Sequence, residues 1–261
     1  MIEIVVTITL VFIISLIFSM FGKGGGELYL PVMLTLLNIV FYIAAGVSLF
    51  IIFLQSISMV LIYSQKLKLV DWKLAIVLAT VVGVSSFIGG FFSEGVSAFY
   101  LKITFSILLI ISAILLFLNK NMKIKSGFGV WHRTLNENEY DVNILYLVLT
   151  VALVGFLAGM VGISGGGLIV PIAIILGGVP VRIAMGTNTV LVLASSSMGF
   201  LGHATNGGVD WALCAELGIA VILGSQIGSR LHAKVDEKSL KIGLAVILIF
   251  AASWMILRAV M

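Results

Sequence analysis

The sequence predicts an all-α membrane protein, with about ten hydrophobic segments arranged as an inverted repeat of five plus five. The first reason is composition: the 261-residue chain is 61% hydrophobic and only 10% charged, and its mean hydropathy is +1.25. A water-soluble domain cannot bury so much apolar surface, so the outer surface must face lipid. The other two reasons are a duplicated glycine motif and an uneven distribution of basic residues among the loops.

Hydrophobic segments follow one another along the chain with short polar connections. In the first half they lie near residues 2–20, 27–39, 42–62, 73–92 and 101–118. In the second half they lie near residues 142–161, 167–177, 183–202, 211–229 and 240–258. Most have about the 20 residues that a helix needs to cross the hydrocarbon core. The second segment of each half is shorter, so it is a half-helix, a re-entrant limb or a helix lengthened by its flanks.

The glycine motif relates the two halves. Gly22 to Pro31 reads GKGGGELYLP, and Gly162 to Pro171, 140 positions later, reads GISGGGLIVP. Further matches follow at nearly the same spacing, among them Asp71-Trp72 with Asp210-Trp211. Ordered matches at a near-constant spacing indicate an internal duplication. We therefore divide the chain into a first transmembrane repeat (1–118), a cytoplasmic connector (119–141) and a second transmembrane repeat (142–261).

Basic residues set the orientation of the segments. Lys and Arg gather in the loop 63–72, in the connector and in the loop after the ninth segment, as in cytoplasmic loops. The loop 203–210 has no Lys or Arg and is expected outside. The loop 203–210 corresponds in the repeat to the loop 63–72, yet the two are expected on opposite sides of the membrane. We therefore expect the halves to be inverted copies, with both termini outside. We expect a multi-pass protein of the plasma or inner membrane that binds no nucleic acid, since the net charge is only +4.

Interrupted segments at matching positions in two halves point to the substrate site of a transporter. A helix that begins inside the membrane presents free backbone N–H groups, which favour an anion, and glycine allows close approach. The candidate loop residues are Gly24, Gly25, Gly26, Ser164, Gly165, Gly166 and Gly167. Neutral side chains that would complete the site are Ser48, Gln55, Thr187, Asn188, Ser195, Ser196 and Gln226. The alternative for all of them is close packing and hydrogen bonding between helices.

Ionisable groups inside the membrane are costly and are therefore functional candidates. Glu216, Glu27 and His203 are candidates for proton coupling. Each has a plainer alternative, such as a hydrogen-bonded acid at a helix interface for Glu216 or a solvated interfacial histidine for His203. Lys23 either attracts anions at the mouth of the site or, as we favour, anchors the segment as a cytoplasmic charge. We expect no metal and no cofactor.

Paired Gly-x-Gly-Gly-Gly-like loops, each followed by a proline and a Gly-Thr-Ser-like segment, resemble the TauE/SafE family over essentially the whole chain. The resemblance implies a secondary transporter, in several members an exporter, of small sulfur-containing anions such as sulfite, thiosulfate or organosulfonates. The Gly-Thr-Ser-like positions are Gly186, Thr187 and Asn188 in one half and Gly46, Val47 and Ser48 in the other. Val47 and Ser164 depart from the pattern and make the site asymmetric. A homodimer stays open as the assembly state.

Two other functions stay open. The nearer one is an anion channel, which would pass current without exchanging anions between the faces. The other is an intramembrane serine protease, because Gly162-Ile163-Ser164-Gly165 matches a Gly-x-Ser-Gly pattern and His203 lies two segments later. Against the protease, Ser164 corresponds in the repeat to Gly24, which indicates a backbone role.

Overall fold

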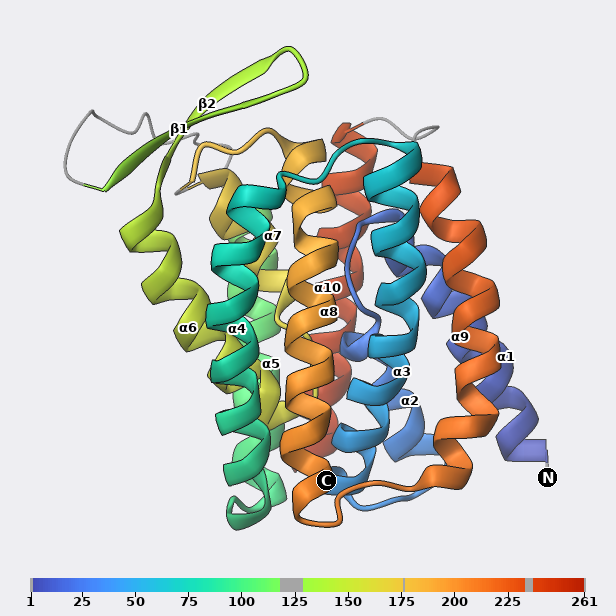
Figure 1. The fold of residues 1–261 in the computed structure, drawn as a ribbon. Coiled ribbons are helices and arrows are strands. Elements are labelled where there is room, and N and C mark those ends of the chain that lie inside the picture. Colours follow the sequence, from blue (N-terminus) through green and yellow to red (C-terminus); the bar gives the residue numbers. More distant parts are fainter. Residues whose placement is uncertain (1, 118–128, 176, 233–236, 261) are drawn as a thin grey trace.

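In the computed structural model, residues 2–117, 129–175, 177–232 and 237–260 are described, and they form a bundle of α-helices with a β-hairpin at one end (Figure 1). The first half contains α1 (Ile2–Met20), α2 (Gly26–Leu36), α3 (Phe41–Leu61), α4 (Trp72–Phe92) and α5 (Ala98–Phe117). A π-helical turn, Ile62–Lys66, lengthens α3, and a 3-10 turn, Ser93–Gly95, follows α4. The second half contains α6 (Ile144–Val161), α7 (Gly166–Ile175), α8 (Val181–Thr205), α9 (Trp211–Leu231) and α10 (Glu237–Val260).

Seven helices in the described residues are long and apolar enough to cross a membrane, namely α1, α3, α4, α5, α6, α8 and α9. Their outward faces carry large apolar side chains, such as Ile2, Leu149 and Ile219, which are 81%, 61% and 68% exposed. Water would not tolerate so many exposed apolar side chains, whereas lipid does. The chain is therefore an all-α membrane protein in its membrane-facing part, as the composition predicts.

The two short helices lie inside the bundle. α2 has 11 residues and α7 has 10. At 1.5 Å per residue each is about 15 Å long, roughly half the hydrocarbon thickness. Every residue of α7 is buried. Each of these helices therefore begins within the protein, directly after a glycine loop.

A β-hairpin, which the sequence pattern did not predict, lies at the end of the connector. Strands β1 (Val130–Leu135) and β2 (Asn138–Asn143) pair antiparallel, with Val130 opposite Asn143 and Leu135 opposite Asn138. Asn136 has a positive φ of 55°, which suits the tight turn between them. The rest of the connector, with Lys120, Lys123 and Lys125, lies outside the described residues.

Helices from the two halves pack in matching pairs. α4 packs against α6 and α8, α9 packs against α1 and α3, α3 contacts α8, and α5 contacts α10. The loop before α4 lies beside the start of α8, since the Asp71 amide donates to Thr187 Oγ1 at 3.0 Å. The loop after α8 lies beside the start of α3, since the Tyr42 hydroxyl donates to the His203 carbonyl at 3.1 Å. These two loops are therefore at opposite ends of the bundle.

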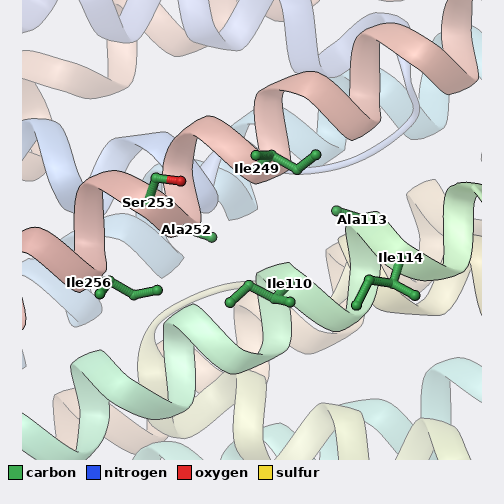
Figure 2. Close-up of a pocket in the computed structure, with 7 residues that line it drawn as sticks. All are labelled: Ile110, Ala113, Ile114, Ile249, Ala252, Ser253 and Ile256. Carbon is green, nitrogen blue, oxygen red and sulfur yellow. The ribbon is translucent and has the colours of Figure 1, made fainter.

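Figure 1 shows the start of α1 and the end of α10 at the lower edge and the hairpin at the upper edge. On the outside of the bundle, α5 and α10 lie side by side and leave a shallow apolar groove between them (Figure 2). The groove is lined by Ile110, Ala113, Ile114, Ile249, Ala252, Ser253 and Ile256. It contains none of the residues predicted to bind substrate.

Candidate functional site

The two glycine loops meet in the interior of the bundle. A methyl group at Gly24 would stand 3.1 Å from Ser164 Oγ, its own counterpart in the repeat. A methyl group at Gly26 would stand 3.1 Å from the Ile163 side chain, and one at Gly166 would stand 3.3 Å from the Lys23 side chain. These last two contacts are equivalent, because Gly26 corresponds in the repeat to Gly166 and Lys23 corresponds to Ile163. The loops thus face each other.

Each loop is also seated against a helix of the opposite half. Gly22 and Gly162 have positive φ values of 64° and 88°, a conformation that glycine adopts without strain. A side chain at Gly22 would collide with the carbonyl of Met185 on α8, and one at Gly162 would collide with Ala45 on α3. Met185 and Ala45 are also counterparts in the repeat. Only glycine allows the backbones to approach so closely.

Polar side chains of α3 and α8 hold the loops in place. Gln55 Oε1 accepts hydrogen bonds from the Gly25 amide at 3.3 Å and the Tyr29 hydroxyl at 2.9 Å, and its Nε2 donates to Ser19 Oγ at 2.9 Å. Ser195, the counterpart of Gln55, donates to the Ser164 carbonyl at 2.8 Å. These two predicted site residues therefore position the loops through their backbone or through neighbouring side chains.

Several buried polar atoms near the loops have no hydrogen-bond partner among the described residues. Asn188 Nδ2 donates to the Gly22 carbonyl at 2.9 Å, but Asn188 Oδ1 is unpaired. The hydroxyls of Ser48 and Ser164 are also unpaired, and these three side chains are at most 2% exposed. Buried polar groups are normally satisfied, so unpaired ones mark the place where a ligand or water would bind.

A buried ion pair lies in the same place. Lys23 Nζ is 2.7 Å from Glu27 Oε1, and the two side chains are 0% and 1% exposed. The pair fills the space beside Gly167, where a methyl group would stand 2.6 Å from Glu27 Oε1 and 2.8 Å from Lys23 Nζ. Our interpretation of Lys23 as a cytoplasmic anchor was wrong, because an anchoring charge would reach water. The i, i+4 spacing of Lys23 and Glu27 was the signal that could have revealed the pair.

The connector hairpin is fastened over the loop that precedes α4. Arg133 donates to both carboxylate oxygens of Asp71, at 2.9 and 2.6 Å, and the Tyr140 hydroxyl donates to Asp71 Oδ2 at 2.7 Å. Burial alone would raise the pKa of Asp71, but the hydrogen bonds from Arg133 and Tyr140 hold that pKa below its ordinary value. Asp71 also caps α4 by accepting from the Leu74 amide at 3.2 Å. The hairpin is thereby joined to the membrane bundle.

The chain also matches a known protein family over nearly its whole length. The family described as "Sulfite exporter TauE/SafE" matches residues 7–255, nearly the whole chain. The chain belongs to the TauE/SafE family. The probable membrane transporter protein YunE of Bacillus subtilis is 26% identical over 98% of both chains. A probable membrane transporter protein of Methanocaldococcus jannaschii is 30% identical over 91% of this chain and 89% of its own length. No solved structure matches. The chain is a multi-pass membrane transporter protein of this family.

Three other predicted site residues of this TauE/SafE protein make hydrogen bonds within a helix or between neighbouring segments of the bundle. Thr187 accepts from the Asp71 amide at the start of α8, and Ser196 donates to the Val192 carbonyl of its own helix at 2.6 Å. Gln226 Nε2 donates to Ser58 Oγ at 3.1 Å, between α9 and α3. These hydrogen bonds are of the kind that joins or stabilises helices.

The remaining proton-coupling candidates are separate from the loops. Glu216 is exposed on α9 and lines an outward groove with Ile8, Thr9 and Phe12 of α1. His203 is buried near the end of α8, where one ring nitrogen, Nε2, is 3.0 Å from the Gly159 carbonyl. In the described residues no hydrogen bond joins His203 to Ser164, whose hydroxyl is unpaired. Of the three candidates, only Glu27 lies where the two loops of this TauE/SafE protein meet.

Proposed function

We propose that this TauE/SafE protein is a secondary transporter, working as an exporter, of small sulfur-containing anions such as sulfite, thiosulfate or short organosulfonates. The observation that carries the proposal is the contact of the two glycine loops, with α2 and α7 each beginning where the loops meet. A small oxyanion between them would accept hydrogen bonds from first-turn amides and from the Ser48 and Ser164 hydroxyls. The description of the family as sulfite exporters supports the substrate class.

The inverted repeat is part of the proposal. A side chain at Gly46 would collide with the Gly208 carbonyl, and one at its counterpart Gly186 would collide with the Leu69 carbonyl. The same correspondence holds elsewhere, where Gly89 meets the Phe156 carbonyl and Gly228 meets the Leu16 carbonyl. Equivalent contacts at several places are what two copies related by a pseudo-two-fold axis would make. Rocking of one half against the other would then expose the loops alternately to the two faces.

Orientation follows from the positions of the basic residues. Lys66 ends the π-helical turn after α3, the Lys68 carbonyl accepts from Asn136 of the hairpin, and Arg133 of the hairpin bonds directly to the loop before α4. Loops rich in basic residues remain in the cytoplasm. We place the hairpin in the cytoplasm and both termini outside. Impermeant thiol labelling of single cysteines at positions 95 and 137 in cells, in a Cys214→Ser background, tests this, with only position 95 expected to react from outside.

Transport is tested in proteoliposomes containing the purified protein. Sulfite, thiosulfate, sulfate and methanesulfonate are supplied in turn, with and without a pH gradient. A carrier shows saturation and counterflow of labelled anion, whereas a channel, the competing function, passes current without counterflow. If no anion in the panel moves, the proposed substrate class is wrong. Size-exclusion chromatography of the same preparation, with light scattering, tests whether the protein is a monomer or the homodimer that the sequence left open.

A matched pair of glycine variants tests the place of binding. Gly166→Ala would bring a methyl group to 2.8 Å from Asn188 Nδ2 and 3.0 Å from the Val192 side chain, without positive-φ strain. Gly95→Ala meets nothing within 4 Å and serves as the control. We expect Gly166→Ala to raise the KM for the transported anion at least tenfold and Gly95→Ala to leave it unchanged. Equal KM values would place binding elsewhere.

A further inference from the structure

The ion pair at the start of α2 is incompletely satisfied. An ammonium has three N–H donors, and a carboxylate has two accepting oxygens. Among the described residues, Glu27 Oε2 has no hydrogen-bond partner, and the Lys23 ammonium has none beyond its ion pair with Glu27 Oε1; the centre of the Phe18 ring is 5.1 Å from Nζ. A buried pair that serves stability alone needs its remaining donors and acceptors satisfied. This pair therefore has free hydrogen-bond donors and a free acceptor that could bind a further ligand.

The surroundings of the pair are suited to an anion. Gly166 and Gly167 face it from the opposite loop, and Asn188 on α8 lies beside Gly166. The neighbouring Tyr29 hydroxyl donates to Gln55. None of these groups is charged, so Lys23 is the one cation and Glu27 the one anion that the described residues place at this point. The counterparts of the pair are Ile163 and Gly167, so the charge lies on one side of the site only.

We propose that Lys23 is the cationic ligand of the transported anion and that Glu27 is the internal anion that occupies Lys23 in its absence. Binding requires Glu27 to accept a proton and leave Lys23, and release of the substrate returns Glu27 to Lys23 as a carboxylate. One proton therefore travels with each singly charged anion. This inference rests on the proposed function and adds to it the coupling ion and the residue that carries the ion.

The balance of charge is the physical reason. With an ionised Glu27, a bound monoanion beside Lys23 would leave a net charge of −1 in a buried, apolar region, which is strongly unfavourable. With a protonated Glu27, the loaded site is neutral. The empty site, with Lys23 and Glu27 both charged, is neutral as well. Both of these states avoid an uncompensated charge while the site changes the face to which it opens.

Methanesulfonate is the probe because its charge stays at −1 over the working pH range. Its binding to the purified full chain in detergent is measured by calorimetry in weakly buffered solution, together with proton uptake. We expect one proton taken up per anion bound, and an affinity that weakens about tenfold for each unit rise in pH. Anion binding without proton uptake would overturn the inference and leave the proposed function intact. Failure to bind methanesulfonate, sulfite or thiosulfate would instead count against the proposed function as well.

Variants assign the effect to the pair. Glu27→Gln should still bind methanesulfonate, without proton uptake and with an affinity that no longer changes with pH. Lys23→Gln should weaken binding at least a hundredfold. Glu94→Gln, the same change at an exposed turn, should keep the wild-type pH slope. If the affinity of Glu27→Gln for methanesulfonate keeps the wild-type dependence on pH, another group carries the proton. Where a variant fails to fold, the proton uptake measured on the wild-type chain still gives the number of protons bound per anion.

Discussion

Gly24 and Ser164 are 140 positions apart and equivalent in the repeat, yet they lie against each other, with Ser164 Oγ 3.1 Å from where a Gly24 side chain would begin. In the inverted repeat that we propose, a residue that touches its own counterpart lies close to the axis that relates the two halves. The loops therefore meet at the point where both halves contribute equally. The single hydroxyl on Ser164 makes this meeting point asymmetric, and it is available because no described residue bonds to it.

Replacing Ser164 with Ala should affect binding and spare folding. The hydroxyl satisfies no described group, so its loss should leave the unfolding temperature within 1–2 degrees of wild type, on the order expected for a neutral change. Loss of one hydrogen bond to the anion should cost about 1 kcal/mol, or roughly fivefold in KM. Ser112→Ala is the control, because that buried serine bonds to the Leu108 carbonyl of its own helix. The prediction fails if the two variants give the same KM for sulfite.

The glycines that seat the loops should be intolerant of any side chain. Gly22→Ala and Gly162→Ala each combine a positive φ with a collision against the opposite half, and together these should cost at least about 2 kcal/mol. Thermal unfolding in detergent measures the loss, with Gly95→Ala as the control. Because the two positions are equivalent, the losses should be similar. Full tolerance at either position would show that the contact seen there does not stabilise the fold.

The link between Asp71 and Arg133 should make stability depend on pH. The pKa of Asp71 is lower in the folded protein than its ordinary value near 4, so its stabilising contribution is fully present above that value. The contribution is lost as the pH falls through the lower folded pKa. Asp71→Asn should therefore unfold at a lower temperature than wild type at pH 7, and the difference should shrink progressively below about pH 4.

A matched control for this link comes from the other half. Asp210 caps α9 as Asp71 caps α4, accepting from the Ala212 and Leu213 amides at 3.0 and 3.1 Å. Arg133 and Tyr140 bond to Asp71, so Asp210→Asn should cost less than Asp71→Asn at pH 7. An Arg133→Gln variant combined with Asp71→Asn should be less destabilised than the sum of the two single changes. Additive losses would mean that the hairpin is held by other contacts.

The sequence predicted those parts of the structure that depend on local patterns. Apolar runs gave the helices, because a helix in lipid must be apolar on its outer face and close its own hydrogen bonds. The repeated glycines pointed to the loops, because a backbone that approaches another backbone closely needs them. The hairpin was missed because its strands, Val130–Leu135 and Asn138–Asn143, lie in a polar connector, and the bonds that hold it reach across the sequence to Asp71.

The charged pair at the site shows where local reasoning stops. Lys23 was recognisable as a basic residue beside an apolar helix, which is the usual position of an anchor in the aqueous phase. Its burial depends on the space beside Gly167, which comes from the other half of the chain. Gln55 and Ser195 were predicted as substrate ligands, and that stays a prediction; the structure adds that both are bonded to the glycine loops, which a sequence pattern alone does not reveal.

Glu216 and Glu27 were both predicted as candidates for proton coupling, and the structure places them differently. The Glu216 side chain is exposed on α9 beside Ile8, Thr9 and Phe12 of α1. Glu27 instead lies within 2.7 Å of the buried Lys23. We therefore expect Glu216→Gln to keep the wild-type response of methanesulfonate uptake to a pH gradient within about twofold, a change of under roughly 0.5 kcal/mol. Glu27→Gln should abolish that response. Loss of the response in Glu216→Gln, with normal exchange of labelled anion, would restore Glu216 as the coupling residue and remove Glu27 from that role.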